Sequence, residues 1–290
     1  MGKLERILEE ERPQLLLIQG DTNTMLAAAL TAIKLKIPVG HVEAGLRSYD
    51  WRMPEEHNRR MVDHISDLLF TPTEHTKKYL LIEHTHGKIY VTGNKIMDAI
   101  CQYLPLAKKK SKITNIIPFN EYAVVTAHRA KNVDNPKILK EFVQAFLNFP
   151  IPIVFPLHPR TRKSLIYHDL YHKLEKSEKI LILPPVGYFD MLTLIERCKL
   201  IVTDSGGLQE EATAPSIRKP VIVLRISTER PEAVEAGFAT VVGVKKQSIL
   251  QAGNSILDNP PILPIVSPFG DGKSSERIVN IISRESEYEL

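Results

Sequence analysis

The chain has 290 residues, of which 43% are hydrophobic and 25% charged, so one large or two ordinary globular domains are expected and disordered or fibrous classes are disfavoured. Its 38 basic and 34 acidic residues leave a charge of only +4, which argues against nucleic-acid binding but suits an anionic small substrate. The two cysteines form no CxxC pair, no apolar run could span a membrane, and the charged N-terminus is unlike a signal peptide, so we expect a cytoplasmic protein.

Apolar runs that are typical of β-strands alternate with helical segments along the chain. A strand over 15–18 precedes a helical stretch over about 22–35, and a strand over 39–42 leads through a loop to a helix over 55–65. Six further strands are predicted, over 123–126, 153–155, 180–183, 200–203, 221–224 and 240–242. Continuous apolar strands alternating with helices indicate parallel sheets covered on both faces, so we predict a doubly wound α/β fold.

Residues 104–120 interrupt this pattern with two prolines, a lysine cluster and no clear periodicity. We interpret this segment as a solvated linker, although its lysines could form an anion patch. The predicted organisation is an N-terminal Rossmann-like domain over 1–110, a C-terminal one over 111–266, and a final helix within 267–290. Ligands of such sheets bind beyond the carboxyl ends of the strands, so we expect the site in a cleft between the domains.

Several common motifs are missing or incomplete. No GxGxxG follows a predicted strand and no HExxH is present, so neither a nicotinamide cofactor nor a metal is predicted. Residues 269–275 mimic the end of a phosphate-binding Walker motif, but Ser267 replaces its first glycine, and a turn that caps the last helix is the simpler interpretation. Thr203 likewise replaces the leading glycine that a GxSxG serine nucleophile around Ser205 would need.

Three acidic residues follow predicted strands or begin predicted helices. Asp21 lies where the first strand gives way to a helix, and it either serves the site or simply caps that helix. Glu43 ends an apolar strand, where an ionised carboxylate is costly to bury unless it is paired. Glu55 opens a helix after a proline, which also suits a structural role. Together the three could supply acid and base groups to one substrate.

The segment Asp204–Glu211 follows another predicted strand and resembles an anion site. Gly206 and Gly207 let backbone N–H groups approach a phosphate at a helix tip, and a glutamate one turn further on can bind a ribose. The alternative is a plain helix capped by Ser205. His128 follows the strand over 123–126, and it either stabilises charge beside phosphates or is structural.

These loops resemble the non-hydrolysing UDP-N-acetylglucosamine 2-epimerases over nearly the whole chain. The matching segments are GDTNT at 20–24, HVEAGLR at 41–47, PEEHNRR at 54–60, TGN at 92–94, AHR at 127–129, DSGGLQEEA at 204–212 and TERPEAVEAG at 228–237. The resemblance implies a GT-B-like pair of Rossmann-like domains, a C-terminal helix that crosses back onto the first domain, a dimer, and interconversion of UDP-GlcNAc and UDP-ManNAc by elimination and re-addition of UDP without a cofactor.

The resemblance also implies roles for individual residues. Catalytic carboxylates are expected at Asp21, Glu43 and Glu55, and a catalytic histidine at His128. The substrate-binding residues implied are Ser205, Gly206 and Gly207 for phosphate, Glu211 for ribose, Arg230 for the substrate, and Val186 and Met191 for uracil. Arg129 and His158 would belong to a second, activating UDP-GlcNAc site, which Ala130 and Lys131 put in doubt because relatives carry Arg-Glu-Asn after the His-Arg pair.

The family pattern normally begins with further strands and a GTRPE loop, which this sequence lacks. We therefore expect an incomplete N-terminal sheet, and reduced or no activity, because that loop supplies cations to the diphosphate. Two alternatives remain: a GT-B-type glycosyltransferase, which would not need the acidic loops, and a non-catalytic remnant that binds UDP-sugars.

Overall fold

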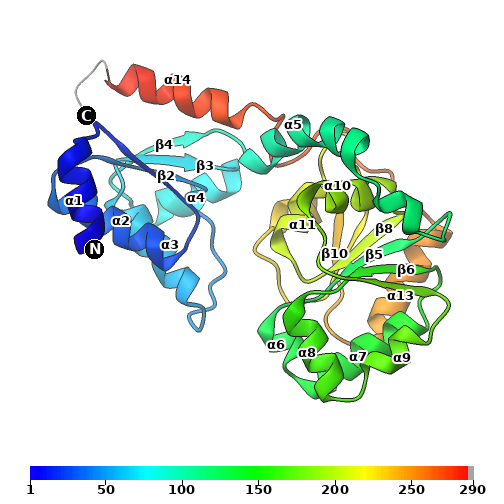
Figure 1. Ribbon diagram of the computed structural model, residues 1–290. Coiled ribbons are helices and arrows are strands. Elements are labelled where there is room, and N and C mark those ends of the chain that lie inside the picture. The colour runs from blue at the N-terminus through cyan, green and yellow to red at the C-terminus, as the bar shows by residue number, and fades with distance from the viewer. Residues whose placement is uncertain (287–290) are drawn as a thin grey trace. The chain divides into compact units, whose positions relative to one another are not determined.

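The computed structural model describes residues 1–286 and divides the chain into two compact units (Figure 1). The first unit comprises residues 1–98 and the segment that starts at Phe269, and the second comprises residues 99–268. Within the described residues, no helix is long and apolar enough to cross a membrane.

The first unit is built on a four-stranded parallel sheet. Its strands lie in the order β1-β2-β3-β4, with β1 and β4 at the edges. The strands are β1 (Leu16–Gln19), β2 (Val39–Val42), β3 (Leu68–Thr71) and β4 (Lys88–Val91), and the helices between and around them are α1 (Gly2–Glu11), α2 (Asn23–Lys34), α3 (Pro54–Ile65), α4 (Glu74–Ile82) and α14 (Ser274–Ser286). The sequence did not predict β3 and β4, which are short and lie close to the helices that precede them.

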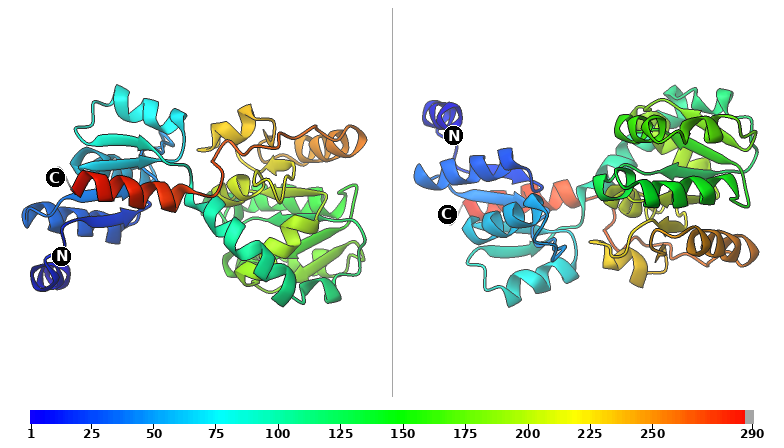
Figure 2. Two further views of the ribbon diagram at one scale, coloured as in Figure 1. Left: turned by 90° about the horizontal axis from the view of Figure 1, so that it is seen from above. Right: turned by 90° about the horizontal axis from the view of Figure 1, so that it is seen from below.

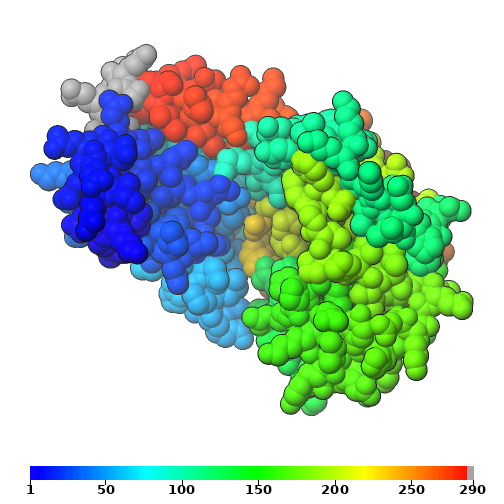
Figure 3. All heavy atoms as spheres, in the orientation of Figure 1, coloured from blue at the N-terminus to red at the C-terminus, as the bar shows by residue number. Residues whose placement is uncertain are grey.

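Helices cover both faces of this sheet because successive side chains of each buried strand point in opposite directions. Val39 packs with α1, α2 and α3, whereas Val42 packs with Ile278 of α14. Figure 2 shows α14 lying along the sheet, and the space-filling view shows its outer side at the surface (Figure 3). Ile281 and Ile282 pack against the same core, so the isoleucines of α14 lie on the side of the helix that faces the sheet.

The start of α14 explains the Walker-like segment at 269–275. The two carboxylate oxygens of Asp98 accept hydrogen bonds from the backbone N–H groups of Ser274 and Ser275, at 3.0 and 2.7 Å. Gly270 and Gly272 have positive φ angles and form the turn before the helix. A carboxylate of the chain itself therefore occupies the helix tip, which agrees with the capping turn.

The second unit contains a six-stranded parallel sheet in the order β10-β9-β8-β5-β6-β7. Its strands are β5 (Ala123–Thr126), β6 (Ile153–Pro156), β7 (Ile180–Leu183), β8 (Leu200–Thr203), β9 (Val221–Val223) and β10 (Ala239–Val241). The six strands predicted from the sequence match these closely. In Figure 1, α10 (Tyr188–Arg197) and α11 (Gly206–Glu211) lie on one side of the sheet, and α7 (Pro136–Leu147), α8 (Pro159–Tyr167) and α9 (Tyr171–Glu175) on the other.

Aromatic and aliphatic side chains fill the core on the α7 side of this sheet. Phe142 and Phe146 of α7 pack with Phe155 of β6 and with Ile249 of α13 (Lys246–Asp258). The remaining short helices of the unit are η1 (Ile113–Ile116), α6 (Ala130–Val133) and α12 (Pro231–Glu235). The sheet therefore has covered faces and exposes the loops at the ends of its strands.

Part of the predicted linker is helical instead. Helix α5 (Lys95–Lys110) runs through Pro105 and into the lysine cluster. Leu104 and Ala107 are buried, so tertiary packing stabilises a helix that the proline and the lysines had obscured in the sequence. Lys108 pairs with Glu196 at 2.8 Å, which places this lysine at a surface ion pair.

Candidate functional site

Two of the predicted acidic residues lie at the end of the first sheet where the carboxyl ends of its parallel strands meet. Asp21 follows β1 and Glu43 follows β2, and these strands pair in parallel up to Gln19 and Val42. A Cβ atom added to Gly20 would lie 3.9 Å from Oε2 of Glu43, so the Glu43 carboxylate reaches the turn that carries Asp21. Parallel pairing thus brings the GDT and HVEAGLR motifs together.

Glu43 has a left-handed backbone with φ of 70°. This conformation is uncommon for a residue with a side chain and costs about 1–3 kcal/mol, and such strain is concentrated at functional sites. The surrounding turn is closely packed, since a Cβ atom at Gly45 would meet the backbone oxygen of Thr76 at 2.4 Å. The tight turn therefore holds the strained backbone of Glu43 in place.

Asp21 does not cap α2. The N-cap is Thr22, whose side chain accepts a hydrogen bond from the backbone N–H of Met25. Asp21 instead accepts a hydrogen bond from Arg59 at 2.6 Å, while Asn58 donates to its backbone oxygen at 2.9 Å. Its side chain is one-third exposed, so helix α3 holds the carboxylate and solvent can still reach it.

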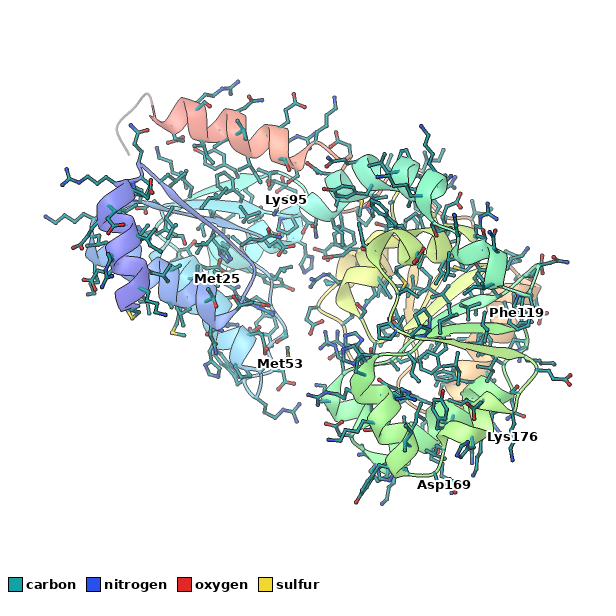
Figure 4. All side chains as sticks on the ribbon, viewed as in Figure 1. Met25, Met53, Lys95, Phe119, Asp169 and Lys176 are labelled. Atoms are coloured by element: carbon teal, nitrogen blue, oxygen red, sulfur yellow. The ribbon has the colours of Figure 1, made fainter. Side chains whose placement is uncertain are left out.

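Helix α3 begins with two glutamates that have different surroundings. Met53, labelled in Figure 4, is the N-cap, and Pro54 occupies the first turn. Glu55 is exposed, as a residue that contacts a ligand would be, whereas Glu56 is fully buried. Glu56 accepts hydrogen bonds from Ser48 and ion-pairs with Arg59 and Arg60, and these partners outweigh burial and lower its pKa. The structure therefore separates an accessible carboxylate from a structural one.

Lys95 is a cation near these loops that the sequence analysis missed. Lys95, labelled in Figure 4, follows the Thr92–Asn94 turn, and its ammonium group donates a hydrogen bond to the side chain of Gln19. Partial burial lowers its pKa, while the charges of Glu43 and Asp98 act in the opposite direction. The only sequence feature that could have indicated Lys95 is its position directly after the TGN motif.

In the second unit, His128 follows β5 and contacts Asp204, which follows the neighbouring strand β8. The imidazole Nδ1 of His128 lies 3.2 Å from Oδ1 of Asp204, and the backbone N–H groups of His128 and Arg129 donate to the same carboxylate at 3.0–3.1 Å. Asp204 is fully buried and also accepts a hydrogen bond from Asn132. Burial would raise the pKa of Asp204, but these donors outweigh it and lower the pKa.

The DSGG segment forms the tip of α11. Ser205 is the N-cap, with its hydroxyl 3.5 Å from the backbone N–H of Leu208, so the capping alternative is part of the structure. Arg230 lies against this tip, since a Cβ atom at Gly206 would be 3.8 Å from its guanidinium carbon. The half-exposed glycines, the helix tip and a guanidinium group therefore converge, which is an arrangement suited to a phosphate.

An ion-pair cluster holds three arginines of this unit. Arg230 donates from Nε to Glu210, while Glu229 accepts two hydrogen bonds from the buried Arg225 and one at 3.3 Å from Arg129. Burial would raise the pKa of Glu229, but the three arginines outweigh it and lower the pKa to about 2. Glu229 thus remains ionised and helps to fix the cations at this end of the sheet.

Glu211 is buried on the first turns of α11 and has an unusual charge environment. Burial and the neighbouring charge of Glu210 raise its pKa to about 7, and a hydrogen bond with Tyr188 opposes the rise. Val186 and Met191, both half-buried, flank Tyr188 in the loop after β7 and the start of α10. The proposed ribose and uracil residues therefore lie in neighbouring elements of one unit.

His158 lies close to the His128 loop. The two imidazole rings have centroids 5.5 Å apart, and Arg129 donates from Nε to the backbone oxygen of Asp204 at 3.0 Å. Arg129 and His158 thus flank His128. Across residues 1–286, no group of three or more His, Cys, Asp or Glu side chains is arranged to hold a metal.

Fold and site together define a nucleotide-sugar protein of the GT-B-like α/β class, with acidic loops on one unit and a basic helix tip on the other. The UDP-N-acetylglucosamine 2-epimerase family model matches residues 1–283. A UDP-N-acetylglucosamine 2-epimerase of Methanocaldococcus jannaschii is 45% identical over 290 residues, covering 97% of this chain and 78% of the relative. The chain belongs to the UDP-N-acetylglucosamine 2-epimerase family.

Solved structures agree with this assignment. The crystal structure of the Methanocaldococcus jannaschii enzyme in complex with UDP-GlcNAc and UDP matches with a TM-score of 0.87, 45% identity, and coverage of 97% of this chain and 79% of that one. The Neisseria meningitidis epimerase bound to UDP-GlcNAc also has a TM-score of 0.87, at 36% identity and with coverage of 98% and 80%. The GT-B-like α/β fold predicted from the sequence is thus confirmed.

Proposed function

We propose that the chain interconverts UDP-GlcNAc and UDP-ManNAc by inverting C2 of the sugar. In this reaction a base removes the C2 proton, the C1–O bond breaks, and its electron pair leaves with UDP to give 2-acetamidoglucal. A proton then adds to the opposite face of C2, and a phosphate oxygen of UDP rejoins C1. The observation that carries the proposal is the pair of carboxylates, Asp21 and Glu43, at one sheet edge in a chain of this family.

We propose that the acidic loops handle the C2 proton. Asp21 and Glu43 come from adjacent turns, and Glu55 is an exposed carboxylate at the start of α3. Paired acid and base groups on both faces of C2 are what inversion requires, and each contributes about 10²–10⁴-fold in rate. Lys95, which interacts electrostatically with Glu43, would place a positive charge near that carboxylate.

We propose that the second unit binds UDP. The diphosphate would meet the tip of α11 at Ser205–Gly207 together with Arg230, and His128 would stabilise the charge that develops as UDP leaves. Glu211 would bind the ribose, and Val186 and Met191 the uracil. Asp204 would accept a hydrogen bond from Nδ1 of His128, so that Nε2 of the ring can face the phosphates.

The test is to incubate the purified chain with UDP-GlcNAc and to identify the products by NMR. We expect UDP-ManNAc and UDP-GlcNAc at equilibrium, with little free ManNAc. The variant Glu43→Gln should abolish the conversion while UDP binding, measured by calorimetry, persists. UDP binding without turnover by the unmodified chain would instead favour the non-catalytic remnant, and transfer of GlcNAc to an acceptor would favour a glycosyltransferase.

The family resemblance also leads us to propose a homodimer and an activating UDP-GlcNAc site at Arg129 and His158. Light scattering of the eluted protein tests the first. A sigmoidal dependence of rate on UDP-GlcNAc, which becomes hyperbolic in His158→Ala, tests the second. The cytoplasmic location stays a prediction of the sequence.

A further inference from the structure

A fully buried histidine, which the proposed chemistry does not use, links the loops of the first unit. His41 lies on β2, two residues before Glu43, and both its side chain and that of Asp63 are inaccessible to solvent. Its Nδ1 lies 2.7 Å from Oδ1 of Asp63, and its Nε2 lies 2.9 Å from the backbone oxygen of Gly20. Gly20 immediately precedes Asp21, so one imidazole spans the Asp21 turn and helix α3.

Each ring nitrogen of His41 faces an oxygen atom. A backbone carbonyl oxygen can only accept, so Nε2 must carry a proton to bond to Gly20. The Asp63 carboxylate also accepts, because its other oxygen, Oδ2, already binds Arg47 at 2.7 Å and the backbone N–H of Gly45 at 3.2 Å. Burial would raise the pKa of Asp63, but His41 and Arg47 outweigh it and lower the pKa. His41 therefore donates from Nε2 to Gly20, and its Nδ1 faces the Asp63 carboxylate.

The charged groups around His41 are paired with one another. Asp63 lies between His41 and Arg47, and Arg47 forms a two-pronged pair with Glu83 at 2.9 and 2.6 Å. Glu83 also pairs with Arg60 at the surface side of the cluster. A buried charge is tolerated only when it is paired and hydrogen-bonded, and each of the buried members meets this condition.

We propose that His41, hydrogen-bonded to Asp63 and to the backbone of Gly20, is a positioning residue that fixes the Asp21 and Glu43 turns relative to α3. Asp63 connects β2 and the Glu43 turn with helix α3. It binds His41 on β2, the backbone of Gly45 in the Glu43 turn, and Arg47. Its own helix, α3, carries Glu55. A misplacement of about 1 Å in such a group can lower a rate about 10²-fold. The inference rests on the proposed function for its catalytic consequence, but not for the hydrogen bonds of His41.

The hydrogen bond to Gly20 is tested without any assay of activity. Histidine ring nitrogens of the 15N-labelled full chain are observed by NMR. The His41 signals are identified by their loss in His41→Asn. We expect a proton on Nε2 of His41 that exchanges slowly with solvent. An Nε2 atom without a proton would overturn the proposal.

The positioning role is tested by kinetics on three variants. His41→Asn keeps an amide donor towards Asp63 but cannot reach Gly20, whereas His41→Gln extends its donor towards Gly20. We expect the first to lower kcat at least roughly tenfold with KM within about threefold, and the second to retain more activity. The matched control is His64→Gln, since His64 is the half-exposed neighbour of Asp63 on α3 and should leave kcat unchanged.

The outcomes separate this inference from the proposed function. If the unmodified chain has no epimerase activity, the proposed function fails, and the NMR result alone decides the state of His41. If the unmodified chain is active and His41→Asn matches its kcat, the positioning role is wrong while the proposed function stands. Circular dichroism and the melting temperature check that each variant, including the first unit that carries His41 and His64, is folded.

Discussion

Replacing Asp204 by asparagine tests how the second unit holds His128. The carboxylate is fully buried and accepts hydrogen bonds from the backbone of His128 and Arg129, from Asn132, and from Nδ1 of His128. The asparagine amide keeps the shape of the aspartate side chain, but it replaces one acceptor oxygen with an NH2 donor that faces other N–H groups. Loss of one charge-assisted hydrogen bond costs about 1.5–3 kcal/mol, so we expect a decrease of that size in unfolding free energy at pH 7.

The loss should depend on pH in a defined direction. Because the folded pKa of Asp204 is lowered, its carboxylate stabilises the fold above the ordinary aspartate pKa, and this stability disappears as the pH falls through the folded value. The difference between the two proteins should therefore be full at pH 7 and shrink at acidic pH. Urea denaturation followed by circular dichroism at several pH values measures it.

The same substitution should lower kcat, because His128 would lose the partner that orients its ring. We expect a decrease of about 10²-fold, measured as UDP-ManNAc formation, with unchanged affinity for UDP. The control is Asp134→Asn, a half-exposed residue of the same region that pairs with Arg160 at the surface, where an ion pair contributes about 0–1 kcal/mol. Asp204→Asn with the stability and kcat of the unmodified protein would refute the reasoning.

Three further substitutions have expected outcomes. Because the pKa of Glu211 is raised to about 7, the folded state loses stability as the pH rises from about 4 to 7. The free energy of unfolding of Glu211→Gln, measured by urea titration, should therefore exceed that of the unmodified chain by an amount that grows between pH 5 and 8, up to about 3 kcal/mol. Gly45→Ala should destabilise by about 2–4 kcal/mol, because φ is positive and the new Cβ meets Thr76, whereas Gly187→Ala, with open space around it, should change the melting temperature little. Asp98→Ala should cost about 1 kcal/mol by uncapping α14, and equal melting temperatures would contradict the capping role.

Much of the fold could be predicted because parallel buried strands leave a strong local pattern. The runs that form β5, β6, β7 and β8 are continuously apolar and were recognised, whereas Lys88–Val91 of β4 carries a lysine and a tyrosine and was not. The helix over Lys95–Lys110 was also missed, since its proline and lysines mask a buried face that only packing shows. Local sequence patterns therefore fail to predict elements whose secondary structure depends on tertiary contacts.

The exposed site residues could be predicted because they follow strands, but their supporting partners could not. Asp21, Glu43 and Ser205 each stand at a strand end or helix start that the sequence marks. Arg59 and Asp63 lie within a helix, and their contacts with Asp21 and His41 span 38 and 22 residues of chain. No local pattern reports such pairings, because the sheet topology creates them.

The most direct test is to follow UDP-GlcNAc and the 290-residue chain in D₂O by NMR. Our account predicts that UDP-ManNAc accumulates with deuterium at C2, and that recovered UDP-GlcNAc acquires it too as the reaction reverses. Product that keeps its original hydrogen at C2 would mean that no carboxylate exchanges this proton with solvent, and it would contradict the elimination route.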